Sequence, residues 1–211
     1  HPQHRRQRQM CIRDSHGTYP FVTSSNTSSA NAAIGSGVGP LNLNKIVGVT
    51  KAYISRVGSG PFITEQKNDI GDYLIEKGAE FGVVTGRRRR CGWLDLISLK
   101  YSVRVNSLTE LFITKLDVLS GLEEIKLGVG YMNGDKVITD YPYQQNVFYN
   151  AEPVYETYAG WSEDITSVRS FDNLPENAKK YITAIEDFIE IPITFISVGP
   201  ERNQNIVIAD D

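Results

Sequence analysis

The clearest chemical signal in this chain is a run of four arginines, Arg87 to Arg90. Guanidinium groups bind phosphate and carboxylate oxygens through paired hydrogen bonds and stay charged at any working pH. Thr85 and Gly86 precede the run and supply a hydroxyl and a backbone that can approach a ligand closely. A solvated basic turn or a nuclear-targeting run is the alternative. We favour an anion-binding loop, because Gly92 and Trp93 follow at once and indicate a folded segment.

A second candidate site is the sequence Thr114-Lys115-Leu116-Asp117, directly after the apolar stretch 111–113. Many GTP-binding folds bind guanine with Thr/Asn-Lys-x-Asp at the end of a buried strand. An ionised Asp117 would accept two hydrogen bonds from the paired N–H groups of guanine, which adenine lacks. The Lys115 stem can pack along the base while its ammonium stays in water. Four residues are a weak match alone, and a strand-capping Asp beside a surface Lys is the alternative.

The loop Ser197-Val198-Gly199-Pro200 follows another apolar stretch, 192–196. Its small residues could expose backbone amides to the carbonyl of a base. Because sites in α/β sheets form at the carboxyl ends of strands, we expect this loop and the Lys115–Asp117 loop to share one base pocket. An ordinary strand-to-loop turn is the alternative.

Other chemistry is weakly supported by the sequence. Cys91 lies beside Arg90, which could lower the pKa of its thiol, but we favour a small packing thiol. Gly35, Gly37 and Gly39 suggest a tight backbone path near a ligand or another segment, although a plain loop is favoured over a phosphate cradle. No His, Cys or Asp cluster has metal-ligand spacing.

Composition limits the class of protein. The chain has 211 residues, 40% of them hydrophobic, enough for a substantial core. A net charge of −3 and a pI near 5.7 argue against general nucleic-acid binding. Two cysteines give no disulfide framework and fit a reducing compartment. No apolar run approaches the ~20 residues of a membrane span, and no secretory signal opens the chain. We therefore expect a soluble cytoplasmic protein without a membrane partner.

Residues 1–15 differ from the rest, because they are basic and show neither helical nor strand periodicity. They resemble translated sequencing-adapter read-through, and a genuine disordered basic arm is the alternative. We favour a non-native segment because Met10 is not a credible start. From His16 onward the sequence indicates a fold entered partway through.

The elements that would position the sites alternate between strands and helices, which predicts an α/β fold. The stretch 141–161 has no clear period and is expected to be an ordered excursion. The predicted strands are 46–57, 111–113, 192–196 and 206–208, the predicted helices begin near residues 69, 94 and 174, and a hairpin joins 125–131 to 136–139 across Asn133-Gly134.

Taken together, these motifs resemble the adenylosuccinate synthetase family. VTSSNT, TGRRRRCGWLD and TKLDVL occur here in that order, and HGTYPFVTSSNTSSA, GSGVGP, KAYISRVGSGPF, LPENAKKYI and ISVGPERNQNIV extend the match. The resemblance runs from His16 to the end, so residues 16–211 resemble the C-terminal portion of that domain. It implies a P-loop-NTPase-like mixed sheet with flanking helices, with the N-terminal half, including the phosphate loop, missing. Val84 and Ile63 depart from a threonine and a proline common in the family.

The resemblance also implies an activity. The family joins IMP and L-aspartate to adenylosuccinate, the first committed step from IMP to AMP, with release of GDP and phosphate from GTP. It phosphorylates the 6-oxygen of IMP, and the aspartate amine then displaces that phosphate. A cytoplasmic homodimer and Mg2+ are implied, but the catalytic residues and the magnesium ligands are expected upstream. The 211-residue chain alone is therefore expected to be inactive.

The implied binding residues follow the three motifs. Arg87 would contact both aspartate and IMP, and Arg89 both aspartate and GTP. The implied IMP-binding residues are Thr23, Val57 and Arg87; the aspartate-binding residues are Val83, Val84, Thr85, Gly86, Arg87, Arg88 and Arg89; and the GTP-binding residues are Arg89, Lys115, Leu116, Asp117, Ser197, Val198 and Gly199.

Two other functions stay open. A regulatory GTP-binding switch built on Lys115–Asp117 would not need the arginine loop, so Arg87→Ala would leave its nucleotide binding unchanged. A non-catalytic anion-binding module would show no preference for guanine over adenine.

Overall fold

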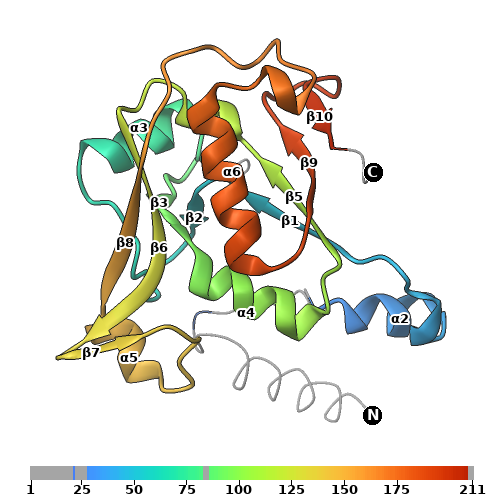
Figure 1. Ribbon diagram of the computed structural model, residues 1–211. Helices are drawn as coiled ribbons and strands as arrows, with labels where there is room; N and C mark the ends of the chain where they lie inside the picture. Colours follow the sequence, from blue (N-terminus) through green and yellow to red (C-terminus); the bar gives the residue numbers. More distant parts are fainter. Residues whose placement is uncertain (1–20, 22–27, 83–85, 209–211) are drawn as a thin grey trace.

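The computed structural model describes residue 21 and residues 28–82 and 86–208 (Figure 1). Its described part contains α-helices and short 3-10 helices (η). The helices are α2 (Ala30–Ser36), η1 (Pro40–Asn42), α3 (Asp69–Lys77), α4 (Leu96–Asn106), η2 (Leu116–Leu119), α5 (Gln145–Asn150), η3 (Phe171–Asn173) and α6 (Glu176–Ile189).

The strands of the described part form three sheets. One is a four-stranded sheet in the order β1-β5-β9-β10, the second pairs β2 with β3, and the third joins β4, β6, β7 and β8. The strands are β1 (Val47–Lys51), β2 (Ile54–Arg56), β3 (Arg90–Gly92), β4 (Leu94–Asp95), β5 (Glu110–Thr114), β6 (Glu124–Asn133), β7 (Lys136–Ile138), β8 (Glu152–Ala159), β9 (Ile193–Ser197) and β10 (Asn205–Val207).

The first sheet places two of the predicted loops side by side. β5 is parallel to both β1 and β9, with Ile113 opposite Thr50 on one side and Ile196 on the other. β10 returns antiparallel to β9. Because β5 and β9 are parallel neighbours, the segments that follow them leave the same edge of the sheet. The mixed α/β fold expected from the sequence is confirmed.

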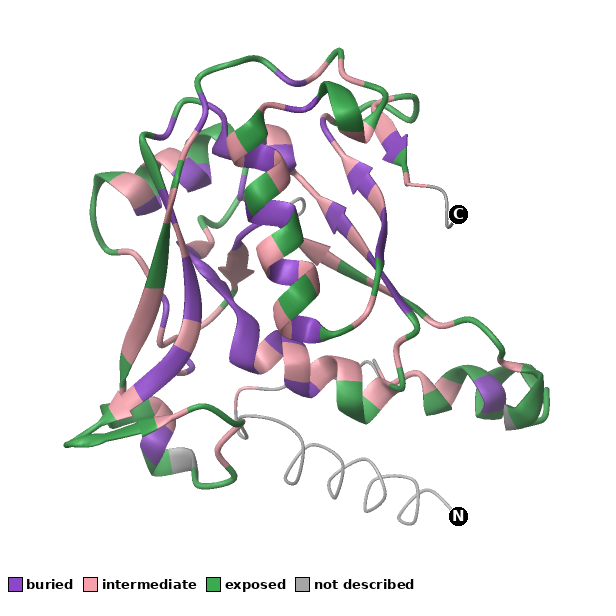
Figure 2. Cartoon of the chain, in the orientation of Figure 1, coloured by how far each residue is buried: buried purple, intermediate pink, exposed green. Residues whose placement is uncertain are grey.

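α6 covers this sheet (Figure 1). Its buried side chains recur at helical spacing, which gives one apolar face toward the strands and one exposed face (Figure 2). Tyr181 is fully buried, and its hydroxyl donates to the carbonyl of Ala52 at 2.7 Å. The spacing of Ala178, Tyr181, Ile182, Ile185 and Phe188 predicts one apolar face. The first four are buried as expected, whereas Phe188 is only half-buried against the core and Ile189 is buried in addition.

The third sheet contains the predicted hairpin. Asn133 pairs with Lys136 across the β6–β7 turn, where Gly134 adopts a positive φ of 62°. β8, which pairs with β6 along most of its length, was not predicted. Its burial is mostly intermediate or exposed, so the alternating pattern that identifies a strand is weak.

Three other expectations were wrong in detail. The strand expected over 46–57 is broken, because β1 ends at Lys51 and β2 pairs instead with β3. Val105, which its helical spacing with Tyr101 places on the apolar face of the predicted helix, is 38% exposed. The segment 35–39, for which a plain loop was favoured, begins inside α2, whose C-cap residue Gly37 has a φ of 72°. A Cβ at Gly35 or Gly37 would meet nothing within 4 Å, so these glycines mark no close approach.

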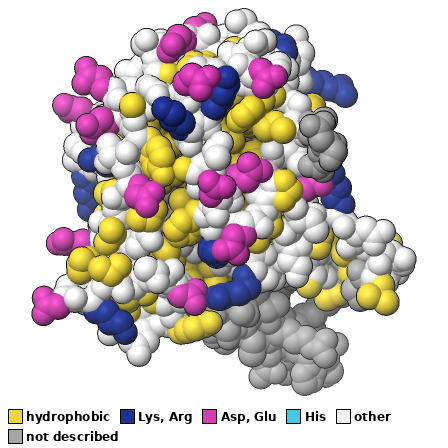
Figure 3. All heavy atoms as spheres, in the orientation of Figure 1, with side chains coloured by type: hydrophobic (Ala, Val, Ile, Leu, Met, Phe, Trp, Pro, Cys, Tyr) yellow, Lys and Arg dark blue, Asp and Glu magenta, His cyan; other side chains and the backbone are white. Residues whose placement is uncertain are grey.

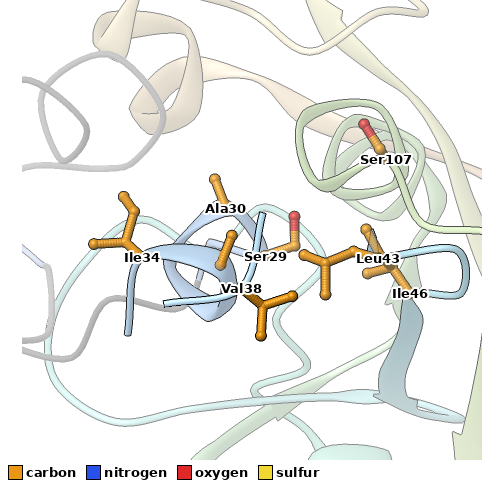
Figure 4. Close-up of a pocket in the computed structure, with 8 residues that line it drawn as sticks. Ser29, Ala30, Ile34, Val38, Leu43, Ile46 and Ser107 are labelled. Carbon is orange, nitrogen blue, oxygen red and sulfur yellow. The ribbon is translucent and has the colours of Figure 1, made fainter. Parts of the chain in front are cut away.

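Two surface features complete the fold. Beside α2, a cavity of about 580 Å³ is lined by α2, the segment that leads into β1, and Ser107 after α4 (Figure 4). On the face that α6 covers, acidic and basic side chains are interspersed (Figure 3). None of the helices in the described ranges is long and apolar enough to cross a membrane.

Candidate functional site

The arginine loop closes on itself through its backbone. The Gly82 amide donates to the carbonyl of Arg87 at 2.8 Å, and the Gly86 amide donates to that of Gly82 at 2.7 Å. The Arg89 amide donates to the carbonyl of Glu80 at 2.9 Å. Gly86 has a φ of 62°, a conformation that a side chain would strain. The described residues on the two sides of the loop are therefore hydrogen-bonded to each other. Val83, Val84 and Thr85 lie outside the described residues, as does Thr23.

The first two arginines of the run present their side chains at the surface. Arg87 and Arg88 are both exposed. Arg88 Nη2 lies 2.5 Å from Asp72 Oδ1, and the two side chains are 49% and 66% exposed. A pair this exposed contributes little to stability. Both guanidinium groups can therefore be reached from solvent.

Arg90, the last arginine, binds the protein itself. Its Nε and Nη2 donate to the two oxygens of Glu65 at 2.6 and 2.5 Å, and these hydrogen bonds lower the pKa of the Glu65 carboxyl. Its Nη1 donates to the carbonyls of Gly58 and Gly60 at 2.9 and 2.7 Å. Val57, the expected neighbour of the IMP ribose, is 62% exposed in the loop that these bonds support. Arg90 is therefore a structural support for that loop.

Arg89 joins a cluster centred on Glu80, whose side chain is 0% exposed. Glu80 Oε1 accepts from Lys51 Nζ at 2.7 Å, from the Tyr53 hydroxyl at 2.6 Å and from Lys115 Nζ at 3.0 Å. Glu80 Oε2 accepts from Lys51 Nζ at 2.8 Å and from Arg89 Nη1 at 3.1 Å. One buried carboxylate thus connects the arginine run with the predicted guanine loop.

The cluster keeps Glu80 ionised. Burial alone would raise the pKa of its carboxyl, but hydrogen bonds from Lys51, Tyr53 and Lys115 outweigh burial and lower the pKa to about 2. Burial lowers the pKa of Lys51, and hydrogen bonding to Glu80 opposes that shift. Glu80 therefore carries a full negative charge at neutral pH, surrounded by three cationic side chains.

The predicted guanine loop follows β5 as expected. Lys115 has a φ of 61°, a left-handed conformation uncommon outside glycine and frequent at functional turns. Its ammonium donates to the Gly78 carbonyl at 2.5 Å as well as to Glu80, and its side chain is 36% exposed, so water is not the only partner of this ammonium. The Leu116 side chain is fully buried in the core, so only its backbone can contact a ligand.

Asp117 has the properties of a prepared hydrogen-bond acceptor. It is half-buried, and no side chain among the described residues donates a hydrogen bond to its carboxylate. Burial raises the pKa of this carboxyl, and a hydrogen bond from the Asp117 backbone N–H together with the nearby charges of Lys77 and Lys115 lowers it only in part. Hydrogen bonds to the ionised form would offset the cost of that burial. Besides its own backbone N–H, the carboxylate can accept further N–H donors from a ligand.

The third predicted loop follows β9, and β9 contacts η2, which contains Asp117. The two loops are therefore neighbours. Val198 is fully buried, and its amide donates to the Gln204 carbonyl at 2.9 Å, so that amide is not open to a base. Ser197 Oγ donates to the Gly199 carbonyl at 2.9 Å. Of the three residues, Ser197 and Gly199 keep partial exposure.

Cys91 is a packing thiol, as favoured from the sequence. It is 1% exposed, and burial raises the pKa of its thiol to about 11. It is therefore not a nucleophile at neutral pH.

Sequence reasoning missed the carboxylates that organise the arginines. Glu80 and Glu65 each bind one arginine of the run, and Lys51 and Tyr53 complete the cluster. A signal was present for Glu80, which is an acidic residue between Ala79 and Phe81 just before four arginines. An acid in an apolar context needs a buried counter-charge, and the neighbouring run could supply it.

The fold and the cationic site define an α/β protein with polar loops gathered at the carboxyl edge of its sheet. The family model of adenylosuccinate synthetase matches residues 9–206. The chain belongs to the adenylosuccinate synthetase family.

Individual relatives agree with this assignment. The adenylosuccinate synthetase of Halothermothrix orenii is 54% identical over 90% of this chain and 45% of its own length. That of Clostridioides difficile is 52% identical over 90% of this chain and 44% of its own length. The structure of a fully ligated adenylosuccinate synthetase from Plasmodium falciparum superposes with a TM-score of 0.87 at 50% identity, covering 92% of this chain and 46% of that one. The chain thus spans about half the length of the relatives it matches.

Proposed function

We propose that the whole protein to which this chain contributes joins IMP and L-aspartate to adenylosuccinate at the expense of GTP. Family membership supports the ligase class. The observation that carries the substrate assignment is the arrangement around Glu80, where Arg89 and Lys115 bind the two oxygens of one carboxylate. The loop proposed to bind anionic substrates and the loop proposed to bind guanine are thereby held against each other.

Asp117 is proposed to select guanine. Its half-buried carboxylate accepts the paired N–H groups of the base, and the stem of Lys115 packs along the ring. Adenine has no such pair, so it would leave the carboxylate desolvated and unpaired, which costs about 1–3 kcal/mol. Ser197 and Gly199 complete the pocket from the neighbouring loop, together with the backbone of Leu116 and Val198.

The arginine loop is proposed to bind L-aspartate and IMP. The exposed Arg87 binds the substrate carboxylate and contacts IMP, and Arg88 and the residues from 83 to 86 are proposed to contact the amino acid. Val57 and Thr23 are proposed to contact the ribose and the phosphate of IMP. Each charge-assisted hydrogen bond of this kind contributes about 1.5–3 kcal/mol. The loop thus orients the aspartate amine toward the purine.

The proposed chemistry has two balanced steps. The 6-oxygen of IMP attacks the γ-phosphorus of GTP while the proton on N1 of the purine is lost, and GDP leaves. The aspartate amine then attacks carbon 6, the phosphate leaves with the 6-oxygen, and the amine loses a proton. In this chain, Arg87 and Arg89 hold anionic groups in place for both steps through electrostatic attraction.

Magnesium is implied by the family. In the part of the chain that the structure describes, no group of three or more His, Cys, Asp or Glu side chains could hold a metal ion. These residues do not fit a magnesium site, and no step above passes through one.

A cytoplasmic homodimer without a nucleic-acid or membrane partner is proposed for the whole protein on family membership alone.

A regulatory GTP-binding switch is the alternative. It is disfavoured by the geometry, because Arg89 and Lys115 share Glu80, whereas a switch built on the guanine loop needs no arginine loop. A general anion-binding module is disfavoured by the acceptor properties of Asp117, which a simple anion cannot use.

A hybrid enzyme tests the proposal. Residues 16–211 replace the matching segment of the Halothermothrix orenii relative, and adenylosuccinate formation from IMP, L-aspartate and GTP is followed chromatographically. The unmodified relative is the control. Formation that requires all three substrates supports the proposal. A hybrid that folds as the relative does but forms no adenylosuccinate contradicts it.

A further inference from the structure

Glu80 is buried at the point where the two proposed binding loops meet. Its Oε1 accepts from Lys115, which begins the guanine loop, and its Oε2 accepts from Arg89, which ends the arginine loop. Lys51 donates to both oxygens. A single carboxylate therefore fixes the separation of two cations, Arg89 and Lys115, that lie far apart in the sequence.

The backbone around Glu80 is fixed independently of these cations. The Glu80 amide donates to the Ile75 carbonyl of α3 at 2.8 Å, and its carbonyl accepts from the Arg89 amide at 2.9 Å. The preceding Ala79 has a φ of 48°, which turns the chain sharply after α3. The carboxylate is thus a rigid anchor, whereas the lysine and arginine side chains that reach it are long and adaptable.

The charge balance makes this anchor necessary. Lys51, Arg89 and Lys115 carry three positive charges around the single negative charge of Glu80, which leaves an excess of two. Like charges at this separation repel each other and would move apart if the carboxylate were neutral. The excess positive charge also attracts further anionic groups, such as those of a nucleotide or an anionic substrate.

We propose that Glu80 is a positioning residue for the ligation reaction, holding Arg89 and Lys115 at a fixed separation so that the arginine loop and the guanine loop bind their ligands as one site. This inference rests on the proposed function. Glu80 does not touch the ligands and acts through the two cations. Its loss should therefore weaken guanine-nucleotide binding more than the loss of an equally buried carboxylate elsewhere.

Glu110 provides that matched control. It is 7% exposed, accepts from the Thr194 hydroxyl at 2.7 Å and pairs with Lys45. It begins β5, whereas Lys115 follows the end of the same strand. Replacing either glutamate by glutamine keeps the shape and removes one buried charge.

The experiment is a calorimetric titration, with GDP and with ADP, of the hybrid enzyme described above, which serves as the wild type. Circular dichroism reports whether each variant is folded. Glu80→Gln should weaken GDP binding roughly tenfold, while Glu110→Gln should stay within roughly twofold of the wild type. In a Lys115→Met background the effect of Glu80→Gln should shrink to roughly threefold or less, because one cation through which it acts is gone.

Equal weakening by Glu80→Gln in both backgrounds would show a merely structural role and overturn the inference. Wild-type affinity in Glu80→Gln would also overturn it. If Glu80→Gln does not fold, Glu80→Asp keeps the charge but shortens the reach, and the same comparisons apply. If the folded wild type does not prefer GDP over ADP, the proposed function fails and the inference fails with it. If the wild type prefers GDP but the Glu80 variant weakens GDP binding no more than the Glu110 variant does, the inference about Glu80 fails while the proposed function stands.

Discussion

Arg90 binds Glu65 through two hydrogen bonds, from Nε to Oε1 at 2.6 Å and from Nη2 to Oε2 at 2.5 Å. The same guanidinium reaches two backbone carbonyls of the preceding loop. Arg87, three residues earlier, is exposed. The arginine run therefore divides into an exposed part that can meet ligands and a partly buried part that supports the structure.

Arg90→Ala should lower the free energy of unfolding by about 2 kcal/mol, because it leaves the Glu65 carboxylate and two carbonyls without their donor. Arg88→Ala, which removes only an exposed pair, should change it by less than about 0.5 kcal/mol. Urea denaturation followed by circular dichroism measures both values. Equal losses in the two variants would contradict the division of the run.

Glu80→Gln should remove an acid-dependent part of the stability. The pKa of Glu80 in the folded protein is lowered from 4.5 to about 2, so its contribution is complete above 4.5 and is lost as the pH falls toward 2. At neutral pH the variant should be less stable by about 2 kcal/mol, below the roughly 3–5 kcal/mol for a broken buried pair, because the cations are partly exposed. Denaturation at several pH values should show this difference shrinking on acidification. A pH-independent difference would refute the electrostatic account.

Cys91 should resist thiol reagents while the protein is folded. Its thiol is 1% exposed, and burial raises its pKa to about 11, so the reactive thiolate is scarce at neutral pH. Mass spectrometry after timed alkylation distinguishes Cys91 from Cys11. Labelling of Cys91 should become rapid only when urea unfolds the chain, and fast labelling without denaturant would show that the site is open.

Arg87→Ala should weaken the use of L-aspartate in the hybrid enzyme described above. Losing one charge-assisted contact should lower kcat/KM for aspartate roughly tenfold to a hundredfold. Arg104→Ala is the control, because Arg104 is 52% exposed and forms an ion pair with the exposed Asp140 at 3.5 Å. Steady-state kinetics with varied aspartate measures the effect. An unchanged aspartate dependence would favour the GTP-binding switch.

The sequence predicted the elements with strong local patterns. α6 shows helical spacing around Tyr181 and Ile185, and β5 and β9 are apolar runs followed by small or charged residues. Because β5 and β9 are parallel neighbours, the loops that follow them lie at the same edge of the sheet. The Thr-Lys-x-Asp motif predicted the guanine-binding role of Asp117, and the resemblance added the role of Arg87; both roles stay predictions.

The features that the sequence did not predict depend on contacts between segments that are distant in the chain. β8 lies at intermediate burial against β6, so its own residues carry a weak pattern. The sequence also did not predict which side chains bind Glu80, because Glu80 contacts Lys115 only after β5 brings the chain back beside α3. Four adjacent arginines appear equivalent in sequence, and only tertiary packing assigns Arg90 to Glu65 and Arg89 to Glu80.

The most direct test of the central claim, that Asp117 selects guanine beside the arginine loop, is a change of base specificity. Binding of GDP and of xanthosine diphosphate is measured for the wild type and for Asp117→Asn. Because xanthine replaces the 2-amino donor of guanine with an acceptor, the wild type should prefer GDP by roughly tenfold or more, and Asp117→Asn should prefer the xanthine nucleotide. A preference that does not change with the substitution would contradict the account.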